Sequence, residues 1–107
     1  MTEIRVFSRN GVVDSISACG HTDYADPGND IVCAGVSTVF RMLTVGMSRL
    51  LDRADFLEID EAKAFMRVSI PATVHSKAAL LVETAVAVLR EFEAQYSTYV
   101  HIVEVRS

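Results

Sequence analysis

The pair Asn10-Gly11 lies between two short segments, Ile4 to Phe7 and Val13 to Ala18, in which apolar and polar residues alternate. Alternation with a period of two is typical of a β-strand that buries one face. Asn-Gly is favoured in two-residue hairpin turns because both residues adopt positive φ at low cost. The sequence therefore predicts a β-hairpin at the start of the chain.

Apolar residues then recur at every third or fourth position from Val32 to Leu51, which predicts an amphipathic helix of about six turns. Asp30 precedes this segment and is expected to be its N-cap, because a short side-chain oxygen can accept a hydrogen bond from a free backbone N–H group. The same spacing extends from Ala78 to Phe92, and it predicts a second helix with Ser76 as its N-cap.

The remaining segments read as strands. Phe56 to Ile59 and Ala64 to Ile70 flank the polar turn Asp60-Glu61, which predicts a second hairpin, and Tyr99 to Val105 alternates again. The order ββαββαβ over residues 1–107 predicts one α+β domain, with a mostly antiparallel sheet and two helices on one of its faces.

Composition excludes some classes of function. The net charge of −4 argues against a nucleic-acid-binding surface. No run reaches the roughly 18 apolar residues of a membrane span, and the N-terminal residues do not resemble a signal peptide. We therefore expect a cytoplasmic protein in which Cys19 and Cys33 are free thiols. The sequence has no CxxC pair and no Cys/His spacing suited to zinc, so neither a metal nor a cofactor is expected.

One loop brings together the residues of a thiol nucleophile. His21 ends a strand-like segment, Cys33 falls in the first turn of the first helix, and the loop Thr22 to Asn29 between them is rich in Gly, Asn, Asp and Pro. The positive end of the helix dipole stabilises a thiolate, and an imidazole can take its proton. Although many cysteines only fill space in a core, this position favours a catalytic pair of His21 and Cys33.

Two neighbouring polar residues have two roles open to them. Asp30 can accept the N–H of Cys33 as an ordinary cap, and it can also orient His21 as the third member of a triad, since the two roles are compatible. Ser37 follows Cys33 by one turn on the same face. Its hydroxyl either forms a hydrogen bond near the site or bonds back to a carbonyl of its own helix.

The sequence also leads to expectations for three glycines and for Cys19, which lie in or near the loop. Gly20 and Gly28 are expected to allow backbone conformations that other residues avoid. Gly35 costs roughly 1 kcal/mol relative to alanine inside a helix, so a closely packed neighbour is expected there. Cys19 is expected to be a buried packing residue, with a resolving thiol for Cys33 as the alternative.

These residues also resemble the signature of a known family, the bacterial ribosomal-processing cysteine proteases of the Prp, or YsxB-like, family. The matching residues are Gly20-His21, Tyr24-Ala25, Gly28, Asp30 to Ala34, and Val36-Ser37. The resemblance extends to the whole domain in length and element order. Thr22 and Gly35 stand where the family usually has alanine, and Pro27 stiffens the loop. These departures affect the expected rate and sequence preference rather than the reacting groups.

The resemblance implies a homodimeric cysteine peptidase. Such a protein removes a short N-terminal extension from a large-subunit ribosomal protein, ribosomal protein twenty-seven, after an aromatic-rich stretch. The family's cysteine and histidine correspond to Cys33 and His21, and its acid and serine to Asp30 and Ser37. The loop Thr22 to Asn29 is thought to move in such proteins when substrate enters.

Two other classes of function stay open on the sequence alone. The first is a ribosome-assembly module that binds the basic tail of a ribosomal protein without cleaving it, for which the acidic charge is equally suitable. The second is a redox sensor in which Cys19 and Cys33 form a disulfide and His21 has no role.

Overall fold

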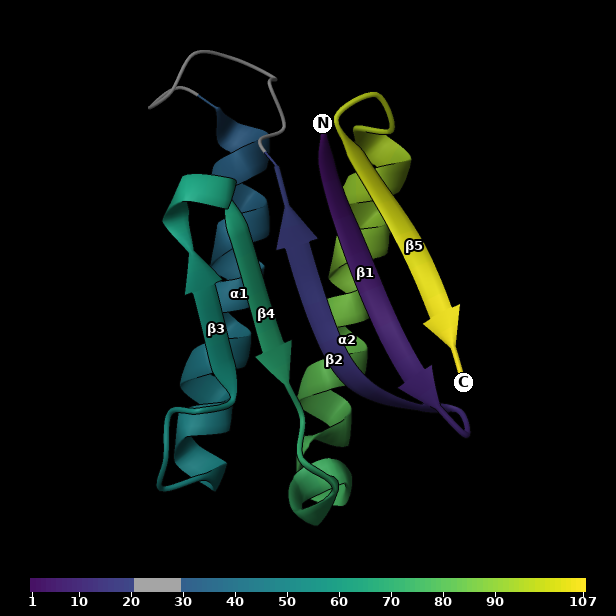
Figure 1. Cartoon of the computed structure of the whole chain (residues 1–107). Helices are drawn as coiled ribbons and strands as arrows, with labels where there is room; N and C mark the ends of the chain where they lie inside the picture. Colours follow the sequence, from purple (N-terminus) through teal and green to yellow (C-terminus); the bar gives the residue numbers. More distant parts are fainter. Residues whose placement is uncertain (21–29) are drawn as a thin grey trace.

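A computed structural model describes residues 1–20 and 30–107 of the chain. It has two layers, a five-stranded sheet and a pair of long helices that both lie on one face of that sheet (Figure 1). The elements are β1 (Thr2–Arg9), β2 (Val12–Cys19), α1 (Ile31–Leu50), β3 (Leu57–Asp60), β4 (Phe65–Ser69), α2 (His75–Gln95) and β5 (Val100–Arg106). The α+β class and the order ββαββαβ are therefore confirmed.

The strands lie in the order β3-β4-β2-β1-β5. The pairs β1–β2, β2–β4 and β3–β4 are antiparallel, whereas β1 and β5 are parallel. The connection between β4 and β5 contains α2, so the chain reaches the far side of β1 by passing over the sheet. The sheet is mostly antiparallel, as the two hairpins predicted, with β2 at its centre and β1 between β2 and the edge strand β5.

The first hairpin turns at the predicted residues. Asn10 has φ of 53° and Gly11 has φ of 79°. Two successive positive φ values are the mark of the type I′ turn that joins twisted strands tightly. A β-bulge between Phe7 and Ser8 shifts the register of the pair β1–β2 beside this turn.

The core lies between the sheet and the two helices. One face of α1 is buried, as its periodicity predicted, and it belongs to the same core as the buried, inward-facing side chains Ile4, Ile16 and Val68 of the sheet. The buried residues of α1 are Val32, Val36, Val39, Phe40, Leu43 and Met47. Those of α2 are Ala78, Val82, Ala85 and Leu89.

The start of α2 differs from its prediction. Ser76 is not the N-cap: the helix begins at His75, and its N-cap, Val74, makes no side-chain capping hydrogen bond. A short 3₁₀ turn, Ala72–Val74, follows Pro71 and continues directly into the helix. Because this turn already carries the chain in a helical direction, the helix starts before the serine is reached.

Gly35 lies where the two helices approach each other. A Cβ atom at this position would lie 2.4 Å from Cζ of Phe92 on α2, far inside van der Waals contact. The prediction of a closely packed neighbour at Gly35 is confirmed. The contact brings the C-terminal part of α2 against the first turns of α1, where Cys33 lies.

Both helical segments, Ile31–Leu50 and Ala72–Gln95, have the length and apolar content of a membrane span. Their buried residues are packed against the sheet, which is the arrangement of core helices in a two-layer domain. Length and composition alone therefore do not separate these core helices from membrane spans, and the expectation that the chain has no membrane span stays a prediction.

Candidate active site

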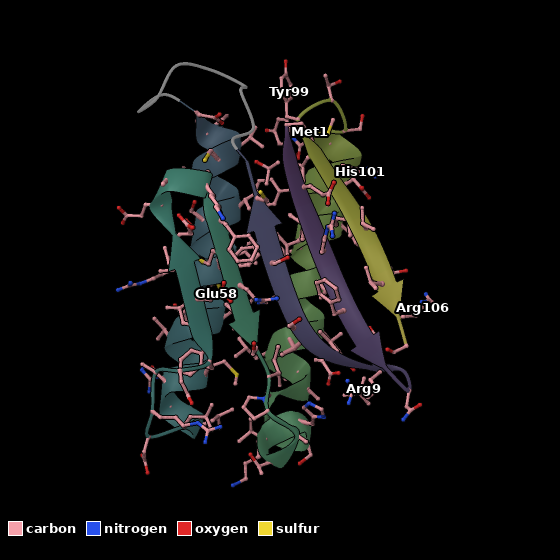
Figure 2. All side chains as sticks on the ribbon, in the orientation of Figure 1. Met1, Arg9, Glu58, Tyr99, His101 and Arg106 are labelled. Carbon is pink, nitrogen blue, oxygen red and sulfur yellow. The ribbon has the colours of Figure 1, made fainter. Side chains whose placement is uncertain are left out.

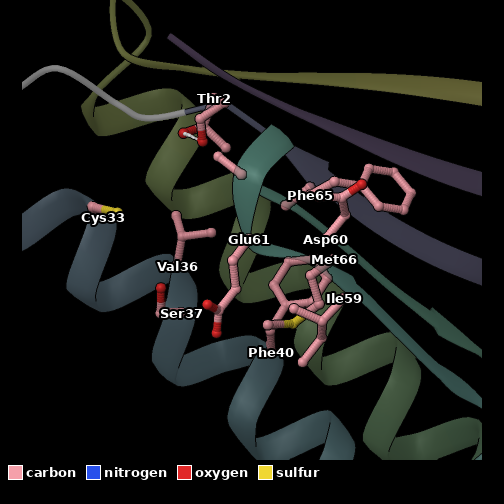
Figure 3. A pocket seen from close by; sticks show the side chains of 13 residues that line it. Thr2, Cys33, Val36, Ser37, Phe40, Ile59, Asp60, Glu61, Phe65 and Met66 are labelled. Atoms are coloured by element: carbon pink, nitrogen blue, oxygen red, sulfur yellow. Dashed lines mark hydrogen bonds between the residues drawn. The ribbon is translucent and has the colours of Figure 1, made fainter.

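A pocket of about 320 Å³ opens between the N-terminal half of α1 and the hairpin β3–β4 (Figure 3). This volume lies in the range of small-ligand pockets. Its lining residues are Thr2, Ala18, Gly20, Cys33, Val36, Ser37, Phe40, Ile59, Asp60, Glu61, Ala64, Phe65 and Met66. The cysteine that the sequence singled out therefore faces a cavity, and it is not part of the packed core.

Cys33 is the third residue of α1 and is half-buried, with a free thiol. Its side chain lies in the first turn of the helix, where unpaired N–H groups and the helix dipole favour a negative charge. The sulfur is thus both accessible from the pocket and placed in an electropositive environment. These are the two conditions that a thiolate nucleophile requires.

Asp30 caps this helix, as predicted. Its backbone is extended, with φ of −81° and ψ of 93°, and its Oδ1 accepts the N–H of Cys33 at 2.8 Å. Its carbonyl oxygen accepts the N–H of Ala34 at 3.1 Å. The cap fixes the first turn and with it the direction of the Cys33 side chain. The second role of Asp30, toward His21, stays a prediction because His21 lies outside the described residues.

The cap also decides which backbone donors are available at the helix start. The N–H groups of Cys33 and Ala34 are both directed to Asp30. Within the described ranges, the N–H groups of Ile31 and Val32 have no acceptor. If the helix start holds an oxyanion, these two groups are the donors that remain for it.

Ser37 lines the same pocket, one turn after Cys33. Its hydroxyl has no hydrogen-bond partner among residues 1–20 and 30–107. Thr38 and Ser48, by contrast, donate to the carbonyl oxygens of Ala34 and Val45 of the same helix, at 2.8 and 2.7 Å. The bond back to its own helix is therefore not made, and the role of the Ser37 hydroxyl in the site stays a prediction.

Gly20 anchors the end of β2 immediately before His21. It has φ of +88°, and a Cβ atom there would lie 2.7 Å from the carbonyl oxygen of Met1. Its N–H donates to the carbonyl of Ala64 at 2.9 Å, and its carbonyl accepts the hydroxyl of Thr2 at 3.2 Å. The predicted need for glycine is confirmed at Gly20. The corresponding prediction for Gly28 falls outside the described residues.

Cys19 is not the buried packing residue that the sequence suggested; it is exposed. In β2 the side chain of Ala18 faces the pocket on the helix side of the sheet, so the next residue faces the opposite side. There Cys19 lines a different surface with Phe7 and Arg67. No contact in the described part of the chain joins the two cysteines.

Sequence reasoning missed most of the pocket wall. Phe40 lies seven residues after Cys33 on the same helical face, so its spacing could have identified it as a lining residue. Ile59, Glu61 and Met66 come from the hairpin β3–β4, and no spacing along the chain connects them to Cys33. Only the packing of this hairpin against α1 brings them into the site.

Replacing the cap tests what Asp30 contributes to the fold. Asp30→Ala should lower the free energy of unfolding by about 1 kcal/mol, because the N–H of Cys33 loses its acceptor. Asp30→Asn should stay within a few tenths of a kcal/mol of wild type, since asparagine is an equally good cap. Urea denaturation measures both. Equal losses in the two variants would show that the negative charge, and not the cap, is what stabilises this helix start.

The comparisons with known proteins agree with this site. A sequence model of the family described as cysteine protease Prp matches residues 1–101. Two curated relatives from Staphylococcus aureus, of strains Mu50 / ATCC 700699 and NCTC 8325 / PS 47, are each called ribosomal processing cysteine protease Prp. Each is 27% identical to this chain over 93 residues, which are 86% of this chain and 87% of the relative.

Solved structures share the fold. Prp from S. aureus, in complex with a covalently linked product peptide, superimposes with a TM-score of 0.87 at 23% identity, over 97% of this chain and 99% of that one. SMU.848 from Streptococcus mutans superimposes with a TM-score of 0.84 at 25% identity, over 100% of this chain and 96% of that one. With a family match over nearly its whole length and a thiol at the mouth of its pocket, this chain belongs to the Prp family of ribosomal processing cysteine proteases.

Proposed function

We propose that this protease removes a short N-terminal extension from a large-subunit ribosomal protein, ribosomal protein twenty-seven. The observation that carries the proposal is the free thiol of Cys33, held in the capped first turn of α1 at the edge of a pocket with apolar walls. Such walls suit the aromatic-rich stretch that precedes the cleavage site in the family. A solved relative with the same fold is described as a complex with a substrate peptide.

In the proposed mechanism His21 accepts the proton of the Cys33 thiol. The thiolate attacks the carbonyl carbon of the scissile peptide bond, and the N–H groups of Ile31 and Val32 stabilise the oxyanion. The protonated imidazole then gives its proton to the leaving amine as the C–N bond breaks. Water then attacks the resulting thioester, which releases the N-terminal extension as a carboxylic acid and restores the free thiol of Cys33. No metal or cofactor takes part in these steps.

The supporting residues act by position. Asp30 holds the first turn through its capping bond, and we propose that it also orients the imidazole of His21. Ser37 offers its unpaired hydroxyl to the substrate. Gly20 fixes the chain immediately before His21.

The reaction is tested on the intact ribosomal protein that carries its N-terminal extension. We expect one discrete truncation product in mass spectrometry after incubation with wild type, and the same product with Cys19→Ala, because Cys19 lies on another surface. Binding of an intact substrate without truncation would instead support the ribosome-assembly module. A disulfide between Cys19 and Cys33 that forms under mild oxidant, with no cleavage of the substrate, would support the thiol redox sensor.

We further propose a cytoplasmic homodimer. No element of the described residues covers the face of the sheet away from the helices (Figures 1 and 2). The strand register places Phe7, Phe65 and Val103, which are half-buried, and the exposed Val105 on this face. Packing a second copy on this face would remove apolar surface from water, a main driving force of association. Sedimentation of the chain at its monomer mass of 11.7 kDa would contradict the dimer, and recovery in the membrane fraction would contradict the location.

A further inference from the structure

Glu61 places an unpaired negative charge at the rim of the pocket. It lies in the 3₁₀ turn Glu61–Lys63 that joins β3 to β4, and it is exposed. Figure 3 shows its side chain extending from this turn toward α1. Among the described residues its carboxylate has no hydrogen bond or ion pair. The other acidic residue of the rim, Asp60, is already used, because its Oδ1 accepts the N–H of Lys63 at 3.2 Å.

Glu61 forms no ion pair with another described residue, although Lys63 lies in the same turn. None of the described residues that line the pocket is basic. The nearby Arg67 faces the other side of the sheet, where it is paired with Glu58 and lies over the ring of Phe65. The carboxylate of Glu61 is therefore available to a group that enters from outside.

The pocket wall beside the Glu61 carboxylate is apolar, and the hydroxyl of Ser37 lies next to this wall as a second hydrogen-bond acceptor. Val36 and Phe40 on α1 face Met66 on β4, and the first two are buried. The hydroxyl of Ser37 opens into the same space and has no partner in the part of the chain that the structure describes. The pocket thus combines an apolar surface with a carboxylate and a hydroxyl at its rim.

A basic side chain matches this combination. Its methylene stem packs on apolar surface while its charged end stays at the water boundary, where it finds acceptors. An uncharged side chain would fill the apolar part and leave the carboxylate without a partner. The acidic balance of the whole chain, −4, adds a favourable field for a basic tail.

We infer that Glu61 is a specificity-determining residue, which binds a lysine or arginine of the substrate close to the scissile bond. The inference rests on the proposed function, since it assumes that the substrate tail lies in the pocket beside Cys33. The aromatic stretch contacts the deeper wall at Phe40 and Met66, and a flanking basic residue reaches Glu61 and Ser37 at the rim.

The test uses a peptide series based on the cleaved tail. Each position within about three residues of the scissile bond receives lysine, norleucine or glutamate in turn; norleucine keeps a four-carbon stem without the charge. Cleavage is followed with wild type, and affinity is measured separately with Cys33→Ala. At one position we expect lysine to be preferred over norleucine about fivefold, in KM and in Kd, with little change in kcat. Added salt should reduce the preference.

Variants of Glu61 make the test specific. Glu61→Gln should reduce the lysine preference to about twofold or less, and Glu61→Lys should reverse it in favour of glutamate at the same position. Glu91→Gln is the matched control, because Glu91 is exposed on α2 and does not line the pocket. It should keep the wild-type preference.

The outcomes separate the inference from the proposed function. Equal use of lysine and norleucine peptides by wild type would overturn the role of Glu61 and leave the peptidase intact. A preference that persists in Glu61→Gln would overturn it as well. If wild type cleaves no peptide, the proposed function fails, and the ratio of affinities for lysine and norleucine peptides still decides whether Glu61 selects a basic residue.

Discussion

Cys33→Ala is expected to lower the rate of tail cleavage by on the order of 10⁵-fold, because the covalent thioester can no longer form. The fold should be unaffected. The capping bond at this position uses the backbone N–H and the side chain of Asp30, so it does not depend on the sulfur. Cleavage is measured by mass spectrometry of the ribosomal protein, and the far-UV circular dichroism spectrum reports on the fold.

Cys33→Ser provides the matched control for shape. It keeps the size and polarity of the side chain, but a hydroxyl is ionised far less readily than a thiol. We expect it to be nearly as inactive as Cys33→Ala while it still binds the tail. Cleavage by either variant at more than about a hundredth of the wild-type rate would contradict a thiolate nucleophile at this position.

Phe40→Ala is expected to have the largest effect on stability, about 3–5 kcal/mol. The ring of Phe40 is 1% exposed and contributes both to the core and to the wall of the pocket. Its removal leaves a cavity that the sheet and α1 cannot close fully. Because the free energy of unfolding of such a domain is only about 5–15 kcal/mol, this loss is a large part of its stability. Urea denaturation gives the free energy of unfolding.

Met42→Ala is the control for this substitution. Met42 lies on the same helix but is 59% exposed, so its loss should change the free energy of unfolding by about 0.5 kcal/mol or less. Similar losses in both variants would mean that the burial of Phe40 does not contribute as the structure indicates. A loss below about 1 kcal/mol for Phe40→Ala would lead to the same conclusion.

The family and the chemistry of the site could be recognised early because they depend on local signals. Asp30 and Cys33 are three residues apart, and a helix cap is decided by such short distances. The Prp resemblance likewise rests on one continuous segment around the loop. The structure confirms the cap and the position of Cys33 in the first turn, and it adds the pocket that Cys33 lines. The pairing of Cys33 with His21 stays a prediction.

The errors concern residues whose surroundings depend on more distant parts of the chain. Cys19 was expected to be buried, but it belongs to the uncovered face of the sheet, and which face a strand residue occupies depends on where the helices pack. Ser76 is a good capping residue by type. The 3₁₀ turn before it, which tertiary packing sets, begins the helix earlier.

By itself, the sequence determined the hairpin at Asn10-Gly11, the two amphipathic helices and the position of Cys33 in a first turn. These features follow from turn chemistry, periodicity and capping, all of which act over a few neighbouring residues. Only the tertiary structure decided that the hairpin β3–β4 packs against α1, that β5 joins β1 in parallel, and that Glu61 lines the same pocket as Cys33. Such contacts join residues far apart in the chain, and their geometry is set by how whole faces pack together.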